Sequence, residues 1–211
     1  MNMAAEFLLP GMSERILEQL FDSPIKVKLL KLFLRNPNKQ FLMPDIIRKI
    51  QERRHAAIKQ VKGLENIGLL LAKRVKTNKK KEIIGGLYFS VNPNFDFYGE
   101  LQSLVLKSSP TSKEKMLKRL MKIGRLRLVL ISGVFLNTAN SRVDLFLVGD
   151  EISRKKLMTF LAEMEAEVGK EIEYAAMETK EFDYRFHMFD RFVRDIIEKP
   201  HEKLLNKLKF V

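Results

Sequence analysis

Hydrophobic residues in the first third of the chain recur every three or four positions, in segments separated by helix-breaking residues. This spacing is typical of amphipathic helices. Ser23-Pro24 and Asn36-Pro37 bound one such segment. Pro44 suits the first turn of the next, because a helix start leaves its first N–H groups unpaired and proline has none. The pattern predicts four helices, over residues 16–21, 25–35, 44–50 and 53–68.

The fourth predicted helix has two chemically different faces. Its apolar face carries Ala57, Ile58, Val61 and Leu64, and its polar face carries His55, Lys59, Lys62 and Asn66. The first face is expected to pack against the rest of the domain, and the second to present hydrogen-bond donors outward.

A β-hairpin is predicted directly after this helix. Residues 69–76 alternate weakly, residues 77–81 form a polar and basic tip, and Leu87, Phe89 and Val91 alternate on the return strand. The order helix, helix, basic hairpin is that of a winged helix-turn-helix.

The second half of the chain alternates between helical and strand-like segments. A cluster of small residues at 108–112 precedes it, so two domains are expected, over residues 1–107 and 113–211. The second domain is expected to have helices at 113–123, 153–168, 180–197 and from His201 onward, with strands at 126–131, 143–148 and 172–177. The fold class expected is α+β, a winged helix-turn-helix followed by a small α/β domain with C-terminal helices.

The predicted helix at 180–197 carries an apolar stripe. Phe182, Phe186, Phe189, Val193 and Ile196 follow one another at alternating steps of four and three. A stripe with this spacing is more often a core face or a subunit seam than a ligand site. We therefore expect it to pack in the core or to form the interface of a homodimer.

Composition excludes several classes of protein. The 211 residues are 45% hydrophobic and include no cysteine, so neither a disulfide nor a thiolate zinc site is expected. The longest apolar run, residues 128–136, is shorter than the ~20 residues of a membrane-spanning helix. The N-terminus lacks the basic start of a secretory signal, and the three histidines are too scattered to share a metal. A cytoplasmic protein with no metal, no cofactor and no membrane partner is expected.

Charge is the most informative property of the sequence. The formal net charge is +13, and twelve Lys or Arg residues lie between Arg48 and Lys81, against only two Glu residues. These cations lie on the predicted helix and hairpin, which favours nucleic acid, and double-stranded DNA in particular, as the partner. A basic helix face by itself is more often a solvated surface than a DNA-binding surface. The basic hairpin that follows this helix favours DNA recognition.

On this interpretation, two groups of residues contact DNA. The first group would enter the major groove, and the second would contact phosphates. The major-groove group is Arg53, Arg54, His55, Lys59 and Lys62, and the phosphate group is Arg74, Lys76, Lys79, Lys80 and Lys81.

Three runs of sequence resemble the winged-helix half of transcriptional regulators that are fused to a nucleotidyltransferase-like domain. They are LFDSPIKVKLLKLFLRNPNKQF, GLENIGLLLAKR and YFSVNPNFDFYGELQSLVLK. In that family Asn-Pro follows the second helix and Val-Asn-Pro closes the wing, as at Asn36-Pro37 and Val91-Asn92-Pro93 here. The stretch at 79–86 is longer and more basic than a tight wing turn requires. The resemblance implies a DNA-binding regulator.

The second half resembles the minimal nucleotidyltransferase fold. Members of that family have Gly-Ser after the first strand and Asp-x-Asp at the second, and their carboxylates bind two Mg²⁺ ions. Here Ser132-Gly133 stands in place of Gly-Ser, and Arg142 stands in place of the Asp two residues before Asp144. Glu173 is placed as the third carboxylate by strand position alone. Because a guanidinium does not ligate a metal, the resemblance implies a vestigial nucleotide pocket at Ser132, Gly133, Arg142 and Asp144 without catalytic residues.

Two interpretations of Arg142 are open. It pairs with Asp144, two positions further along the same predicted strand, or it anchors a phosphate. In the second case the former active site would sense a nucleotide effector.

The function expected is that of a sequence-specific transcriptional regulator that is catalytically inactive and dimerises through its second domain. One alternative is an active nucleotidyltransferase that binds its substrate through the winged helix. Another is an antitoxin-like scaffold whose basic surface neutralises an acidic protein.

Overall fold

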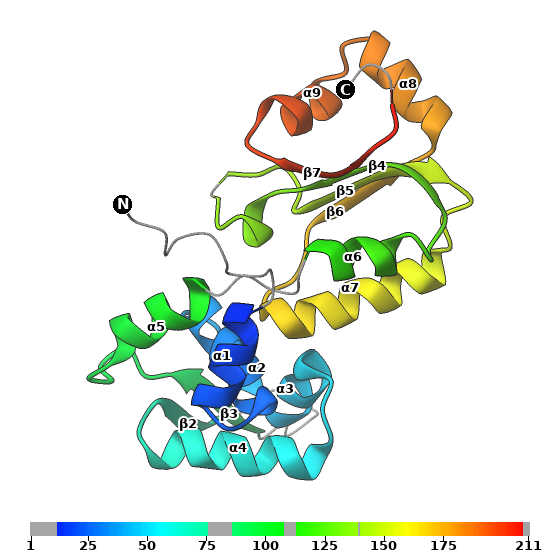
Figure 1. Cartoon of the computed structure of the whole chain (residues 1–211). Helices are drawn as coiled ribbons and strands as arrows, with labels where there is room; N and C mark the ends of the chain where they lie inside the picture. The colour runs from blue at the N-terminus through cyan, green and yellow to red at the C-terminus, as the bar shows by residue number, and fades with distance from the viewer. Residues whose placement is uncertain (1–11, 76–85, 108–112, 139, 209–211) are drawn as a thin grey trace, which may run out of the picture. The chain divides into compact units, whose positions relative to one another are not determined.

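The computed structural model describes residues 12–75, 86–107, 113–138 and 140–208, which form a mixed α+β structure with two small sheets (Figure 1). The described residues separate into two compact units. The first unit contains those of 12–107 together with 165–170, and the second contains those of 113–164 and 171–208. Within these ranges, no helix combines the length and the apolar character needed to cross a bilayer.

The first unit combines helices with a small antiparallel sheet. Its elements are α1 (Met12–Leu20), α2 (Pro24–Arg35), β1 (Phe41–Leu42), α3 (Met43–Ile50), α4 (Arg54–Asn66), β2 (Leu70–Val75), β3 (Gly86–Val91) and α5 (Tyr98–Lys107). The four helices predicted from hydrophobic spacing are confirmed, and their ends differ by a few residues. Helix α5 is an additional element that the hydrophobic pattern did not predict.

Side-chain hydrogen bonds explain where α2 begins and ends. Ser23 Oγ accepts a hydrogen bond from the N–H of Lys26 at 3.2 Å, and Pro24 occupies the first turn. At the other end, Asn36 Nδ2 donates to the carbonyl of Leu32 at 2.7 Å. The Ser-Pro and Asn-Pro pairs of the sequence therefore mark both ends of this helix.

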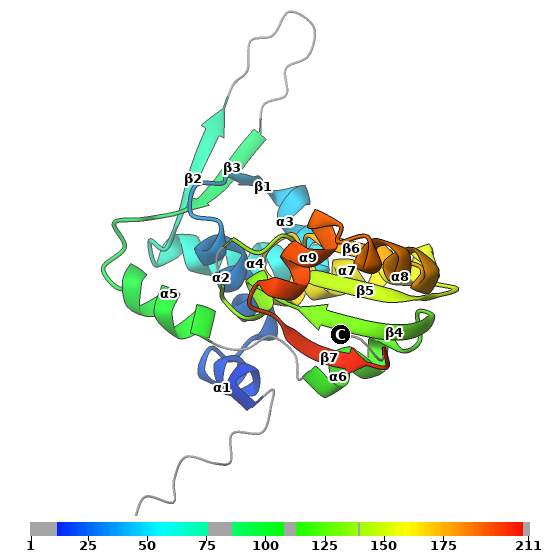
Figure 2. The ribbon, with the colours of Figure 1, turned by 90° about the horizontal axis from the view of Figure 1, so that it is seen from above.

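The sheet of the first unit has the strand order β1-β3-β2, and every pair is antiparallel. Asn92 closes the β2–β3 ladder, because its Nδ2 donates to the carbonyl of Gly68 at 2.9 Å and its N–H to that of Leu69 at 2.8 Å. Strand β2 lies at the edge of the sheet. Figure 2 shows β2 and β3 extending beyond the helices of this unit.

Helix α2 lies at the centre of the first hydrophobic core. Phe33 packs edge-on against Phe41 of β1, with ring centroids 5.7 Å apart. The same core includes three buried residues of α4, namely Ala57, Val61 and Leu64. Because these three residues point inward, the remaining face of α4 must point away from the core.

The second unit is built on a four-stranded sheet of order β6-β5-β4-β7. Its elements are α6 (Lys113–Leu120), β4 (Arg125–Ile131), the 3₁₀ turn η1 (Gly133–Phe135), β5 (Leu145–Asp150), α7 (Arg154–Val168), β6 (Tyr174–Met177), α8 (Thr179–His187), α9 (Arg191–Glu198) and β7 (Glu202–Asn206). Strand β4 pairs antiparallel with β5 and β7, and β5 pairs parallel with β6.

Helices cover both faces of this sheet. Figure 1 shows α6 and α7 on one face and α8 and α9 on the other. Side chains of a strand alternate between the two faces, so both sets must be apolar here. On the α8 and α9 side, the core contains Leu128, Leu130, Phe146, Val148, Phe182, Val193 and Ile196.

The single long helix expected at 180–197 is wrong, because α8 and α9 are separate helices. Phe189 has a positive φ of 55°, and Asp190 starts α9 by accepting the N–H of Val193 at 3.1 Å. Phe189 is therefore 73% exposed, whereas Phe182 is buried. The continuous aromatic stripe does not form, since its middle member lies in the turn between the helices.

The helix expected from His201 onward is also wrong, because this segment is strand β7. Leu205 of β7 lies opposite Val129 of β4, in an antiparallel pair. Pairing satisfies backbone N–H and C=O groups that β4 would otherwise leave at an open edge. This gain overrides the local helical preference, so the last element of the second unit within the described residues is a strand that follows α8 and α9.

Candidate functional site

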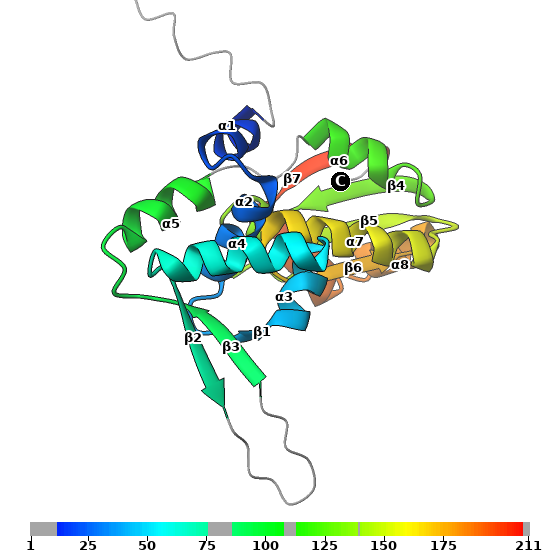
Figure 3. The same cartoon turned by 90° about the horizontal axis from the view of Figure 1, so that it is seen from below.

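The outward face of α4 is basic. Residues that share it are exposed, while the opposite face is buried. The exposed residues are Arg53 at the N-cap, Arg54, His55, Lys59, Lys62 and Asn66. The division of this helix into two faces, predicted from its sequence, is confirmed. Figure 3 shows the helix along its length, with β2 starting and β3 ending near its C-terminal end.

Neighbouring carboxylates neutralise little of this charge. Glu52 is bound by Lys28, with Nζ and Oε1 2.6 Å apart, and Asp45 is bound by Arg48 at 2.7 Å. Among the residues that the structure describes, no carboxylate lies within ion-pair distance of the cations on α4. Their charge is therefore available to solvent or to an anionic partner.

The N-terminus of α4 adds to the positive field. Arg53 at the N-cap offers no side-chain acceptor to the first turn, and that turn contains no acidic residue. A helix start carries a partial positive charge equivalent to about half an elementary charge. Its N–H groups form a natural contact for a phosphate, and Arg53 and Arg54 reinforce that contact.

Strand β2, which follows α4 in the sequence, carries further cations. Arg74 and Lys73 are both exposed on this edge strand. Lys73 was not among the predicted contact residues, although it belongs to the same basic run. The predicted contact residues Lys76, Lys79, Lys80 and Lys81 lie outside the described residues.

Asp144 is the structural centre of the second predicted site. Its Oδ1 accepts the N–H of Val134 at 2.7 Å, and its Oδ2 accepts the N–H of Glu173 at 3.0 Å. Its main-chain carbonyl accepts the N–H of Ser132 at 2.9 Å. Both carboxylate oxygens therefore fix the backbone of neighbouring segments.

Gly133 can occupy its position only because it has no side chain. Its φ is +52°, and a Cβ atom there would collide with Oδ1 of Asp144. Its N–H donates to Oγ of Ser141 at 2.9 Å, while the hydroxyl of Ser132 donates to the carbonyl of Val143. Three of the four predicted pocket residues, Ser132, Gly133 and Asp144, thus meet in one hydrogen-bonded turn.

The interpretation that Arg142 pairs with Asp144 is wrong. Strand β5 begins only at Leu145, so the two residues do not share a strand face. The guanidinium of Arg142 instead lies 5.7 Å from the ring centroid of Phe192, and its Nε is 3.8 Å from Oδ2 of Asp195. Helix α9 supplies both partners, and an exposed ion pair at this distance contributes little.

Two further acidic residues of the second unit, Glu173 and Asp150, make contacts that fix the backbone. Glu173 is exposed and contacts Asp144 through its main chain. Asp150, at the end of β5, accepts hydrogen bonds from the N–H and the hydroxyl of Thr179, at 3.3 and 3.0 Å, and so fixes the start of α8. In the part of the chain that the structure covers, no three His, Asp or Glu residues are placed to hold a metal ion.

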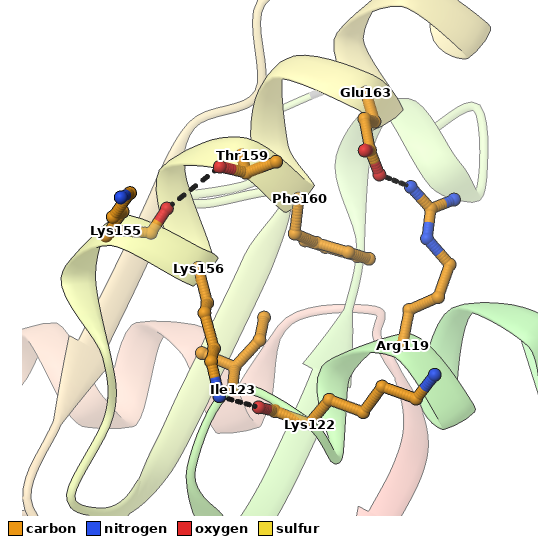
Figure 4. A pocket seen from close by; sticks show the side chains of 8 residues that line it. All are labelled: Arg119, Lys122, Ile123, Lys155, Lys156, Thr159, Phe160 and Glu163. Atoms are coloured by element: carbon orange, nitrogen blue, oxygen red, sulfur yellow. Dashed lines mark hydrogen bonds and ion pairs between the residues drawn. The ribbon is translucent and has the colours of Figure 1, made fainter.

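A further group of cations was not singled out by the sequence. Arg119 and Lys122, at the end of α6 and just after it, line a cavity of about 570 Å³ with Lys155 and Lys156 of α7 (Figure 4). The two pairs are far apart in the chain and lie outside the most basic stretch. General basicity was the only signal, and it could not have brought these residues together.

Comparisons with known proteins give no assignment, since no family model, curated protein or solved structure matches the chain. The basic face of α4 and the turn around Asp144 are therefore the features on which a functional argument can rest. The cations of α4 are exposed and can contact an anionic partner. The carboxylate of Asp144 instead accepts backbone N–H groups of its own unit.

Proposed function

We propose that the chain is a sequence-specific regulator that binds double-stranded DNA through a winged helix-turn-helix in its first unit. The observation that carries this proposal is the basic face of α4, whose cations have no carboxylate partner among the described residues. The element order also supports it. Helices α3 and α4 are joined by three residues, and an antiparallel hairpin follows directly.

In this proposal α4 enters the major groove. His55, Lys59 and Lys62 follow one another at steps of four and three, so they lie on one side of the helix and can reach successive base edges. Arg53 and Arg54 contact the phosphate at the start of α4, and Arg74 contacts the backbone from β2. Base contacts then set the preferred sequence, and phosphate contacts supply most of the affinity.

The affinity for duplex DNA is expected to fall steeply with salt. If six to eight cations meet phosphates, a plot of log K against log salt concentration should have a slope of about −5 to −7, since each neutralised phosphate releases counterions. Replacing Lys79, Lys80 and Lys81 together with alanine should flatten that slope and leave the sequence preference intact. Fluorescence anisotropy across a salt series measures both, and an affinity independent of salt would contradict DNA binding.

In vitro selection from a random duplex pool tests the proposal directly. An enriched motif bound far more tightly than bulk DNA supports a regulator, because base contacts discriminate by about 1–3 kcal/mol each. Equal affinity for all duplexes would instead favour a scaffold that neutralises an acidic protein. The homodimer expected from the sequence stays a prediction, and an inverted repeat in the motif would support it.

For the second unit we propose a nucleotidyltransferase-like domain without catalytic activity. The supporting observations are that both carboxylate oxygens of Asp144 already accept backbone N–H groups, and that Arg142 stands two positions before it in the sequence, where the family pattern has an acid. Two-metal catalysis requires several carboxylates that converge on the ions. A nucleotide effector bound by Arg142 stays a separate prediction.

No nucleotide transfer is expected from the wild-type protein. Incubation with each labelled ribonucleoside triphosphate and Mg²⁺ or Mn²⁺ should give no labelled protein, DNA or RNA, because one ligand position carries a guanidinium, which does not ligate a metal, in place of a carboxylate. Arg142→Asp alone should not restore turnover. Robust metal-dependent transfer would promote the enzyme alternative, provided that a correctly folded Asp144→Asn variant has lost it.

A further inference from the structure

The cavity between α6 and α7 has an unusual balance of charge. Four of its lining residues are basic and one, Glu163, is acidic. Glu163 is engaged by Arg119, whose guanidinium also lies 5.3 Å from the ring centroid of Phe160. Arg119 is thus held in place by two neighbours, and the acid of the cavity is already neutralised.

Among the described residues, none of the three lysines is paired with a carboxylate. Lys156 Nζ donates to the main-chain carbonyl of Lys122 at 3.1 Å, a neutral acceptor that leaves the ammonium charge uncompensated (Figure 4). Within the described residues, neither Lys122 nor Lys155 has an ion-pair partner for its ammonium group. Concave surfaces lined by one sign of charge concentrate the opposite ion, because the low-dielectric walls focus the field.

The floor of the cavity is apolar and well packed. Ile123 and Phe160 are each 4% exposed, so the cations are mounted on a fixed base. Thr159 uses its hydroxyl proton within α7, donating to the carbonyl of Lys155 at 3.1 Å. Hydrogen bonds to a ligand would therefore come from the lysine ammonium groups.

We infer that this cavity binds a small molecule carrying several phosphate groups. Lysine ammonium groups act as point charges toward phosphate oxygens, and three of them suit a ligand with several negative charges. The cavity volume of about 570 Å³ falls within the range of small-molecule sites. The site includes neither Arg142 nor Asp144, and it shares no residue with the proposed DNA-binding face.

Isothermal titration calorimetry with inorganic tripolyphosphate and with ATP tests this inference. The full chain carrying Arg53→Gln, Arg54→Gln, Lys59→Gln and Lys62→Gln serves as the background, so that phosphate binding at the basic face of α4 is reduced. Both probes are expected to bind at micromolar concentration. Adding Lys122→Gln and Lys155→Gln should weaken both by about tenfold, as expected for the loss of two charge-assisted contacts at a partly exposed site.

Two controls make the result decisive. Lys180→Gln with Lys203→Gln removes the same charge from exposed positions of the second unit outside the cavity, and should leave the affinity within about twofold. Lys122→Arg with Lys155→Arg keeps the charge and should retain binding. Dissociation constants above about 1 mM, or equal losses in the Lys122/Lys155 and Lys180/Lys203 variants, would overturn the inference. So would ready displacement of ATP by a duplex at equivalent phosphate concentration, since the cavity would then be a DNA contact.

Discussion

Replacing Lys59 and Lys62 together with glutamate should weaken binding to the selected duplex by about 1000-fold, the largest functional effect expected for this protein. Each lysine is exposed on the outward face of α4. Losing a base or phosphate contact costs about 1–3 kcal/mol, and each new carboxylate also faces the phosphate backbone with a like charge. Fluorescence anisotropy at fixed salt measures the change.

The matched control makes the same change of charge at two other positions. Lys180→Glu with Lys203→Glu changes the net charge equally, at exposed positions of the second unit, and is expected to cost less than about fivefold because neither lysine belongs to the proposed DNA-binding face. Both double variants should keep the wild-type free energy of unfolding within about 0.5 kcal/mol, as is usual for exposed positions. Equal losses of affinity in the two variants would show that only net charge matters and would contradict a role for α4 in recognition.

Single substitutions separate affinity from specificity. Lys59→Ala or Lys62→Ala should change which duplexes are enriched if that side chain reaches a base edge. A phosphate contact would instead lower the affinity for all duplexes alike. Repeating the selection with each variant therefore distinguishes the two roles residue by residue.

Gly133→Ala is expected to reduce the free energy of unfolding by about 3 kcal/mol or more, the largest stability effect expected in the second unit. The added Cβ atom would collide with Oδ1 of Asp144, and the positive φ of Gly133 is unfavourable for alanine. Asp144→Ala should cost a similar amount, because the N–H groups of Val134 and Glu173 would lose their acceptors. Differential scanning calorimetry and chemical denaturation measure both changes.

Gly63→Ala provides the matched glycine control. A Cβ atom at Gly63 meets nothing within 4 Å, and the residue lies inside α4, so alanine should stabilise the protein by about 0.5–1 kcal/mol. A Gly133→Ala variant as stable as the wild type would show that the turn at Asp144 rearranges freely and that its hydrogen bonds contribute little. Asp144→Asn retains one oxygen acceptor and should be intermediate, which makes it the better variant for activity assays.

The role of Asp144 also affects how loss of activity can be interpreted. Its carboxylate bonds link the turn after β4 to the start of β6. A variant that lacks those bonds can lose any property of the second unit by unfolding. Activity measurements on Asp144 variants therefore require a stability measurement on the same sample.

Much of the first unit could be predicted from the sequence, because its helix ends are set by local contacts. Ser23 starts α2 by accepting the N–H of Lys26 three residues later, and Pro24 fits the first turn. Asn36 ends the helix by bonding back four residues. The buried and exposed faces of α4 follow from a spacing that any helix imposes. Contacts between residues three or four positions apart can be predicted from a short segment of sequence.

The C-terminal segments of the second unit were mispredicted because their structure depends on distant partners. The segment after His201 becomes a strand by pairing with β4, which lies some seventy residues earlier in the chain. The break at Phe189 combines a left-handed residue with a helix cap at Asp190, and the regular spacing of apolar residues continues across it. Hydrophobic periodicity does not report either event.

The sequence by itself determined the basic character of residues 48–81, the two faces of α4 and the mixed α+β class, since charge and periodicity are properties of the chain alone. Only the tertiary structure decided that Asp144 bonds to backbone N–H groups, that Arg142 turns toward α9, and that four cations line one cavity. Each of these depends on which segments the fold brings within a few ångströms of one another. Hydrogen bonds and ion pairs act only over such distances, so no pattern along the chain could have specified them.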